Sequence, residues 1–125
     1  MSPVSVRYIV EDVDRAVAFY GELLGFDVEM HPAPGFAILR RDDIRLLLNA
    51  PGAGGAGRAG DDATPEPGGW NRFQLTETDL VTTVERLRDA GAQFRSGIVD
   101  GQGGRQALVA DPSGNVVELF EPAQH

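Results

Sequence analysis

The chain has 125 residues, enough for one domain and short of two ordinary ones, and 11 basic against 19 acidic residues give a formal net charge of −8. It has no cysteine and only two histidines, which excludes disulfides, thiolate metal sites and a histidine-rich metal centre. The acidic balance argues against nucleic acid as a partner, because phosphate backbones attract basic surfaces. No apolar stretch approaches the roughly 18 residues of a membrane span and no signal peptide is evident, so we expect a cytoplasmic protein.

The first fifty residues predict one helix among four strands. Asp12 stands where a side chain can cap a helix, and apolar residues then recur on one helical face from Val13 to Leu24. Gly25 fits the position after the helix, where the backbone is left-handed. The β-branched and apolar runs predict strands at residues 4–10, 26–30, 36–40 and 44–49.

Residues 51–69 predict a linker between two halves of the chain. Ten of these 19 residues are glycine or proline, and they show no apolar periodicity. A phosphate-binding loop is the more specific alternative interpretation of this segment, but the segment has neither the GxxxxGK[ST] spacing nor a lysine.

The pattern restarts after the linker. Asp79 is the expected helix cap, Leu80, Val84 and Leu87 form an apolar stripe, and Gly91 is the expected helix end. Asp111-Pro112-Ser113-Gly114 matches a type I turn between two strands. The strands are predicted at residues 72–76, 105–110 and 116–120, with further extended segments around Phe94 and Ile98-Val99.

The two halves are an internal repeat. Asp12 corresponds to Asp79, a shift of 67, and Gly25 corresponds to Gly91, a shift of 66. One such half alone would leave a sheet face uncovered, so we expect the halves to cover each other or a partner.

Three segments carry a resemblance to the vicinal oxygen chelate superfamily, which includes glyoxalase I, bleomycin-resistance proteins and extradiol dioxygenases. They are VEDVDRAVAFYGELLGF at 10–26, GWNRFQLTETDLVTTVERLRDAGAQF at 69–94 and ALVADPSGNVVELFEP at 107–122. The resemblance implies an α+β fold in which two βαβββ modules form a curled mixed sheet around a cleft. It also implies a single domain over 1–125, with module one at 1–50, the linker at 51–69 and module two at 70–125, and a homodimer.

Metal-using members of the superfamily place ligands on the first and last strands of each module. The resemblance puts these positions on Ser5, on Leu46 or Leu47, on Arg72 and on Glu118. Only Glu118 keeps a metal-binding side chain, and the permanent charge of Arg72 opposes a divalent ion. We therefore expect neither a metal nor another cofactor.

The resemblance also implies that Arg72 and Glu118 lie on neighbouring strands and point into the cleft, where they would form a charge-assisted pair. Our hypothesis is that Arg72 takes the electrostatic place of the metal beside Glu118, which makes these two residues the catalytic candidates if the protein is an enzyme. The alternative is a surface salt bridge that contributes little.

Strand alternation names further ligand-binding candidates, because side chains at i, i+2 and i+4 share a face. Trp70 is a stacking candidate, although an aromatic residue at a module junction more often only packs. His31 is more simply an exposed histidine than a general base. The complete set of expected ligand-binding residues is Ser5, Arg7, Leu46, Leu48, Trp70, Arg72, Gln74, Glu118 and Phe120.

The favoured function is metal-independent binding of a small organic molecule, a natural product or an antibiotic, in the cleft between the modules. An acidic protein suits a cationic ligand, whereas Arg7 and Arg72 suit an anionic or carbonyl-bearing one, so the ligand class stays open. The alternative is a lyase, isomerase or dioxygenase in which Glu118 acts as base and Arg72 stabilises an oxyanion. A protein-interaction module is a third class, and no feature of the sequence supports it.

Overall fold

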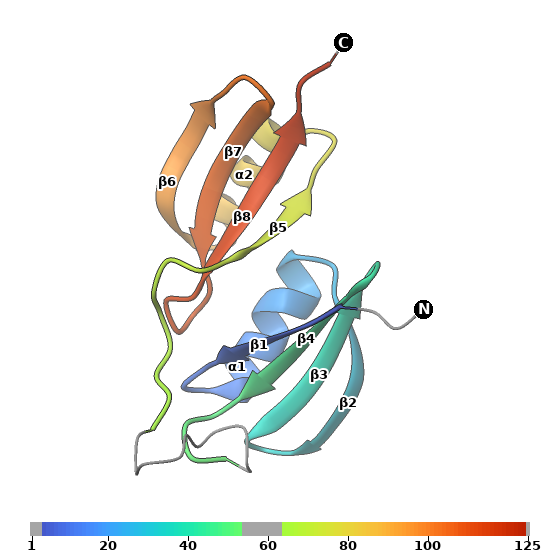
Figure 1. The fold of residues 1–125 in the computed structure, drawn as a ribbon, viewed down its shortest axis with the longest axis vertical. Helices are drawn as coiled ribbons and strands as arrows, with labels where there is room; N and C mark the ends of the chain where they lie inside the picture. Colours follow the sequence, from blue (N-terminus) through green and yellow to red (C-terminus); the bar gives the residue numbers. More distant parts are fainter. Residues whose placement is uncertain (1–3, 54–63, 125) are drawn as a thin grey trace. The chain divides into compact units, whose positions relative to one another are not determined.

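The computed structural model describes residues 4–53 and 64–124. The chain forms two compact units, Met1–Gly68 and Gly69–His125. Each unit contains one four-stranded mixed sheet and its own helical segment, as the α+β interpretation predicts (Figure 1). The central part of the predicted linker, residues 54–63, lies outside the described residues.

In the first unit the strand order is β1-β4-β3-β2, with β1 parallel to β4 and the other pairs antiparallel. Asp12 caps the helix as predicted, because its Oδ1 accepts a hydrogen bond of 3.1 Å from the backbone N–H of Arg15. Gly25 follows the helical segment with φ +73°, which a glycine adopts without strain. The elements are β1 (Val4–Ile9), α1 (Val13–Ala18), η1 (Phe19–Leu23), β2 (Asp27–Ala33), β3 (Phe36–Arg41) and β4 (Ile44–Asn49).

The first helix differs from the expectation in its second half. The α-helical geometry ends at Ala18, and η1 continues as a wider π-helix turn. Phe19 and Tyr20 are adjacent, yet both are buried, and their rings meet edge to face with centroids 5.0 Å apart. Tyr20 also meets Phe26 edge to face at 5.6 Å. The wider turn accompanies this aromatic packing, which the apolar spacing alone does not reveal.

The second unit repeats the topology, with strand order β5-β8-β7-β6 and β5 parallel to β8. Asp79 caps its helix with two hydrogen bonds from Thr82, one from the backbone N–H at 3.2 Å and one from Oγ1 at 2.7 Å. The hydrogen bond from the Thr82 side chain is the main cause of the lowered pKa of Asp79. The elements are β5 (Phe73–Thr76), α2 (Leu80–Asp89), β6 (Gln93–Asp100), β7 (Gly104–Ala110) and β8 (Val116–Pro122).

The core of each unit lies between the helix and one face of the sheet. Helix α1 packs against β3 and β4, and α2 packs against β6, β7 and β8. We call the opposite face of each sheet its far face. Among the described residues, no helix is long and apolar enough to span a membrane. The largest side chains with almost no exposed surface are those of Tyr20, Leu39, Leu46, Leu48, Leu80, Leu87 and Leu119.

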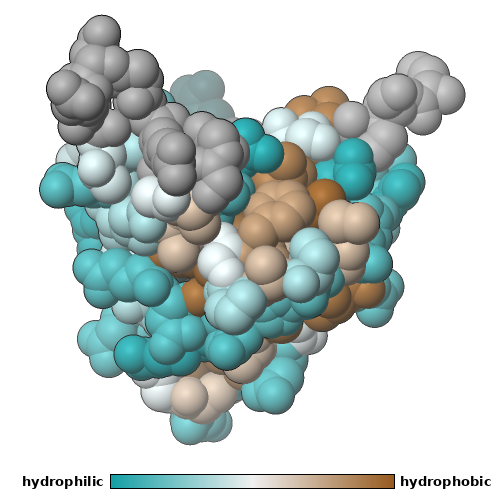
Figure 2. Space-filling view, turned by 90° about the horizontal axis from the view of Figure 1, so that it is seen from below, coloured by the Kyte–Doolittle hydropathy of each residue, from teal (hydrophilic) through white to brown (hydrophobic). Residues whose placement is uncertain are grey.

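Some large hydrophobic side chains remain at the surface. Figure 2 shows a hydrophobic area bordered by hydrophilic residues on one face of the molecule. Isolated exposed hydrophobic residues are normal in a folded protein, so exposure alone does not mark a site. The exposed large hydrophobic residues are Val4, Val28, Met30, Trp70, Val81 and Val99.

Candidate functional site

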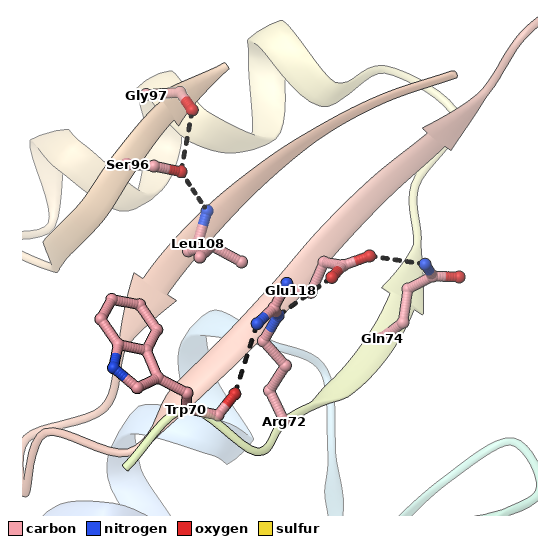
Figure 3. A network of polar contacts seen from close by, with 7 residues as sticks. All are labelled: Trp70, Arg72, Gln74, Ser96, Gly97, Leu108 and Glu118. Atoms are coloured by element: carbon pink, nitrogen blue, oxygen red, sulfur yellow. Dashed lines mark hydrogen bonds and ion pairs between the residues drawn. The ribbon is translucent and has the colours of Figure 1, made fainter. Parts of the chain in front are cut away.

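The predicted contact between Arg72 and Glu118 is present on the far face of the second sheet. Arg72 immediately precedes β5, and its Nε donates a 3.0 Å hydrogen bond to Glu118 Oε1. Gln74 lies opposite Glu118 in the parallel ladder, and its Nε2 donates a 2.6 Å hydrogen bond to Oε2. Each oxygen of the carboxylate therefore has its own donor (Figure 3).

The side chains of the Arg72 and Glu118 pair are only partly exposed to solvent. The Glu118 side chain is 12% exposed and the Arg72 side chain 29% exposed. Arg72 Nη1 also donates to the backbone carbonyl of Trp70 at 3.3 Å, which adds a second point of attachment for the guanidinium. A charge-assisted pair with extra hydrogen bonds and partial burial is more rigid than an isolated surface salt bridge.

Trp70 has a partner that the sequence analysis did not identify. The guanidinium carbon of Arg95 lies 3.9 Å from the centroid of the Trp70 ring, and Trp70 is 63% exposed. Arg95 lies in a bulge of β6, where the ladder to β7 shifts between Phe94 and Ser96.

Ser96 completes the bulge with two hydrogen bonds of its side chain. Its Oγ accepts from the backbone N–H of Leu108 and donates to the carbonyl of Gly97, both at 3.1 Å (Figure 3). These contacts compensate for the interrupted ladder next to Arg95. Strand alternation does not predict a bulge, and the sequence analysis therefore did not identify Arg95.

Phe120 lies two residues beyond Glu118 on the same strand and the same far face. It pairs with Thr76 on β5 and with Gln106 on β7. Together with Gln106 it lines a hollow of about 260 Å³ near the turn between β6 and β7. The other residues of this hollow are Val99, Asp100, Gly101, Gly103 and Gly104.

The structure corrects the expected position of Leu46 and Leu48. The ladder pairs Leu46 with Val6 and Leu48 with Tyr8, so both leucines lie on the helix-facing side of the first sheet. Both are fully buried, and neither lines the far face with Arg7. The expectation that Leu46 and Leu48 line the ligand-binding face with Ser5 and Arg7 is wrong, because the strand pairing puts them one residue out of phase.

Leu47 occupies the place on the far face that was expected for those leucines. It pairs with Arg7, while Ser5 pairs with Arg45. Of the two alternatives for the last-strand ligand position in the first unit, Leu46 or Leu47, the register therefore selects Leu47. His31 lies elsewhere, within β2, with its Nε2 3.4 Å from Asp14 Oδ1.

The donor set at the superfamily's ligand positions does not fit a divalent metal. A leucine side chain has no donor atom, and Arg72 brings a fixed positive charge to within 3.0 Å of Glu118. The Glu118 carboxylate already accepts hydrogen bonds from Arg72 and Gln74. Within residues 4–53 and 64–124, no three His, Cys, Asp or Glu side chains are grouped so that they could hold a metal ion.

Comparison with solved structures finds the same fold in many proteins. TnmS3, an antibiotic binding protein from Streptomyces sp. CB03234, is 28% identical with a TM-score of 0.74, over 98% of both chains. A superfamily member from Sphaerobacter thermophilus is 25% identical with a TM-score of 0.76, over 97% of both chains. Lactoylglutathione lyase from Agrobacterium tumefaciens is 20% identical with a TM-score of 0.76, over 94% of this chain and 91% of that chain, which shows the fold alone.

The sequence comparisons address the family directly. None of the curated proteins matches this sequence. The family model described as Glyoxalase/Bleomycin resistance protein/Dioxygenase superfamily matches residues 3–119, which is nearly the whole chain. On that match, and in agreement with the repeated unit and the neighbouring folds, the chain belongs to the glyoxalase/bleomycin resistance protein/dioxygenase superfamily.

Proposed function

We propose that the protein binds a small organic molecule, a natural product or an antibiotic, without a metal. The observation that carries this proposal is the network of Arg72, Gln74 and Glu118 on the far face of the second sheet. A preorganised polar group beside aromatic and apolar side chains is the usual composition of a small-molecule site. Trp70 and Phe120 supply the aromatic surface, and Ser5 and Arg7 remain candidates on the first unit.

The comparison with TnmS3 supports a small-molecule binding function. That protein is described as an antibiotic binding protein, and it matches this chain over 98% of its length. A lyase, isomerase or dioxygenase acting on a small carbonyl or aromatic substrate remains the alternative, with Glu118 as base and Arg72 as oxyanion donor. Against this alternative, both carboxylate oxygens of Glu118 already accept hydrogen bonds, from Arg72 and from Gln74.

The proposal is tested by a ligand screen with matched variants. Natural products, including antibiotics, are added to the protein and the unfolding midpoint is measured, since a ligand of the native state raises it by mass action. Hits are then titrated by calorimetry against Arg72→Met and Glu118→Gln. The control is Arg105→Met, because Arg105 Nη2 and Glu121 Oε2 form an ion pair of 3.2 Å on the helix side of the same sheet, where Glu121 Oε1 also accepts from the backbone N–H of Leu80.

We expect the variants of the second unit to bind about tenfold more weakly or worse, which corresponds to loss of a charge-assisted contact. The Arg105→Met control should bind within about twofold of the parent protein. A library without a single binder, or unchanged binding by both Arg72→Met and Glu118→Gln, contradicts the proposal.

We further propose that the protein is a cytoplasmic homodimer, of which the dimer rests on the superfamily resemblance. Light scattering coupled to size-exclusion chromatography measures the mass directly. A mass of twice 13.4 kDa is expected, and a mass of 13.4 kDa at all concentrations contradicts the dimer.

A further inference from the structure

We infer that Trp70 and Arg95 form a stacking platform for a flat aromatic molecule that carries an anionic oxygen, such as an aromatic carboxylate or a phenolate. The inference rests on the proposed function, because it names the ligand class of the same far face. It goes beyond that function in assigning Arg95, which no sequence pattern identified, as the residue that recognises the anion.

The first observation is that the Arg95 guanidinium has no ion-pair partner among the described residues. In the described part of the chain, no carboxylate lies within ion-pair distance of its guanidinium, whereas Arg72 pairs with Glu118 and Arg105 with Glu121. The recorded contact of the Arg95 guanidinium is the face of the Trp70 ring at 3.9 Å. A stacked guanidinium keeps its in-plane N–H donors directed outward, where they match the geometry of a carboxylate.

The second observation is the surface of Trp70. A tryptophan that is 63% exposed leaves much of its ring available, and planar ring systems stack on such a surface. The carbonyl of Trp70 is held by Arg72 Nη1 at 3.3 Å, so the backbone of the platform is connected to the polar network. The bulge in β6 sets Arg95 over this ring, and bulges commonly redirect side chains at binding sites.

The third observation concerns the sign of the ligand charge. The net charge of −8 by itself favours a cation. Locally, however, the nearest carboxylate of the network, Glu118, is already neutralised by Arg72 and also hydrogen-bonded to Gln74. Arg95 lies beside this neutralised pair with no carboxylate of the described residues within ion-pair distance, and its contact is with the Trp70 ring. A ligand on this platform therefore gains from a negative oxygen and loses from an ammonium group.

The experiment compares three probes with one ring system: anthraquinone-2-carboxylate, the neutral 2-carboxamide and the cationic 2-aminomethyl derivative. Trp70 is the only tryptophan of the chain, so quenching of its fluorescence reports binding at the platform itself. Affinities are confirmed by calorimetry. The test variant is Arg95→Gln, and the matched control is Arg88→Gln, because Arg88 also lies over an aromatic ring, that of Phe94, at 5.1 Å.

We expect the parent protein to bind the carboxylate about tenfold more tightly than the carboxamide, and the ammonium probe most weakly. Arg95→Gln should remove the preference for the carboxylate, and Arg88→Gln should keep it. Trp70→Leu should weaken all three probes together, because the stacking surface is lost.

Equal affinities for the three probes, tightest binding of the ammonium probe, or an unchanged preference in Arg95→Gln would each overturn the inference. Such a result leaves the proposed function intact if hits of the natural-product screen still depend on Arg72 and Glu118. Absence of binding by every probe also overturns the inference, and the screen then decides separately whether the protein binds any small molecule.

Discussion

The two units share one topology but carry different chemistry on their far faces. β1 ends at Ile9 and β5 at Thr76, each three residues before its helix cap, which gives a shift of 67 between equivalent positions. By the pairing of the strands, Leu47 in β4 and Glu118 in β8 then occupy the same place. One scaffold thus presents an apolar side chain in the first unit and a carboxylate in the second.

The two units also differ in which strands supply the hydrogen-bond donors to their carboxylates. In the second unit the carboxylate is held from the neighbouring parallel strand, by Gln74 and by Arg72 just before it. In the first unit the ion pairs also lie on the far face but toward its other edge, where Glu29 of β2 contacts Arg45 at 3.1 Å and Arg40 at 3.7 Å. A buried or half-buried charge needs a local partner, so the position of the charge decides which strands supply the donors.

The largest expected effect tests which leucine of the first unit belongs to the core. Leu46→Ala should reduce the free energy of unfolding by about 2–5 kcal/mol, because Leu46 is fully buried against the helix side. Leu47→Ala on the far face should cost only about 1 kcal/mol. Chemical denaturation of both variants measures the difference, and equal losses would contradict the assigned register.

The next effect compares a glycine of each unit. A Cβ on Gly104, which has φ +150°, would clash with the backbone carbonyl oxygen of Glu121 and would lie 2.9 Å from the Phe120 ring. Gly104→Ala should therefore cost about 3 kcal/mol, since backbone cannot move aside easily. A Cβ on Gly35 would instead meet the methyl group of Ala53 at 2.8 Å. Gly35→Ala should cost less in the same denaturation measurement, and the reverse order would contradict this reasoning.

A smaller effect is expected from substitutions that give the second unit the apolar side chain of the first. Arg72→Met leaves the Glu118 carboxylate, whose side chain is 12% exposed, without its ion pair, and should cost about 1–2 kcal/mol. The double variant Arg72→Met with Glu118→Leu places at position 118 the residue type found at position 47, and should recover part of that loss. A double-mutant cycle of unfolding free energies gives the coupling free energy between Arg72 and Glu118. Strictly additive losses would mean that the ion pair does not contribute to stability.

The smallest effect concerns the two helix caps. Hydrogen bonds from Thr82 hold the pKa of Asp79 below the ordinary value of 3.8. A lowered folded-state pKa means that the stabilisation is complete above the unfolded-state pKa and is lost as the pH falls through the folded-state pKa. The stability difference between the parent protein and Asp79→Asn should therefore shrink in strongly acidic solution.

Urea unfolding at neutral and strongly acidic pH measures this difference. Asp12→Asn is the matched cap of the first unit, where Oδ1 accepts one hydrogen bond, from the Arg15 N–H. We expect a smaller loss of stability there at neutral pH. A difference between the parent protein and Asp79→Asn that is independent of pH would show that ionisation of Asp79 does not contribute.

Local patterns in the sequence predicted most of the secondary structure. The strand 44–49 and the helix beginning at Leu80 appear where they were predicted, and Asp12 and Asp79 are the caps. Gly25 and Gly91 have the positive φ values expected after a helix, +73° and +91°. The contact of Arg72 with Glu118 was predicted from the resemblance, and its role in binding stays a prediction.

Three features depended on tertiary structure. Which of Leu46 and Leu47 faces the helix follows from the pairing with β1, because a shift of one residue exchanges the two faces of a strand. The π-helix turn at Phe19–Leu23 accompanies the packing of three aromatic rings. The stacking of Arg95 on Trp70 follows from a bulge between paired strands.

The sequence by itself determined the repeat, the order of the elements, the helix caps and the acidic charge, because these depend on residues close together in the chain. The tertiary structure alone decided the phase of the β4 side chains, the wide helical turn and the Arg95 stack on Trp70. The phase of β4 and the Arg95 stack arise from contacts between segments far apart in the sequence, β1 with β4 and Trp70 with Arg95, whose register local preferences do not encode. The wide helical turn accompanies the packing of neighbouring aromatic rings, which the apolar spacing alone does not reveal.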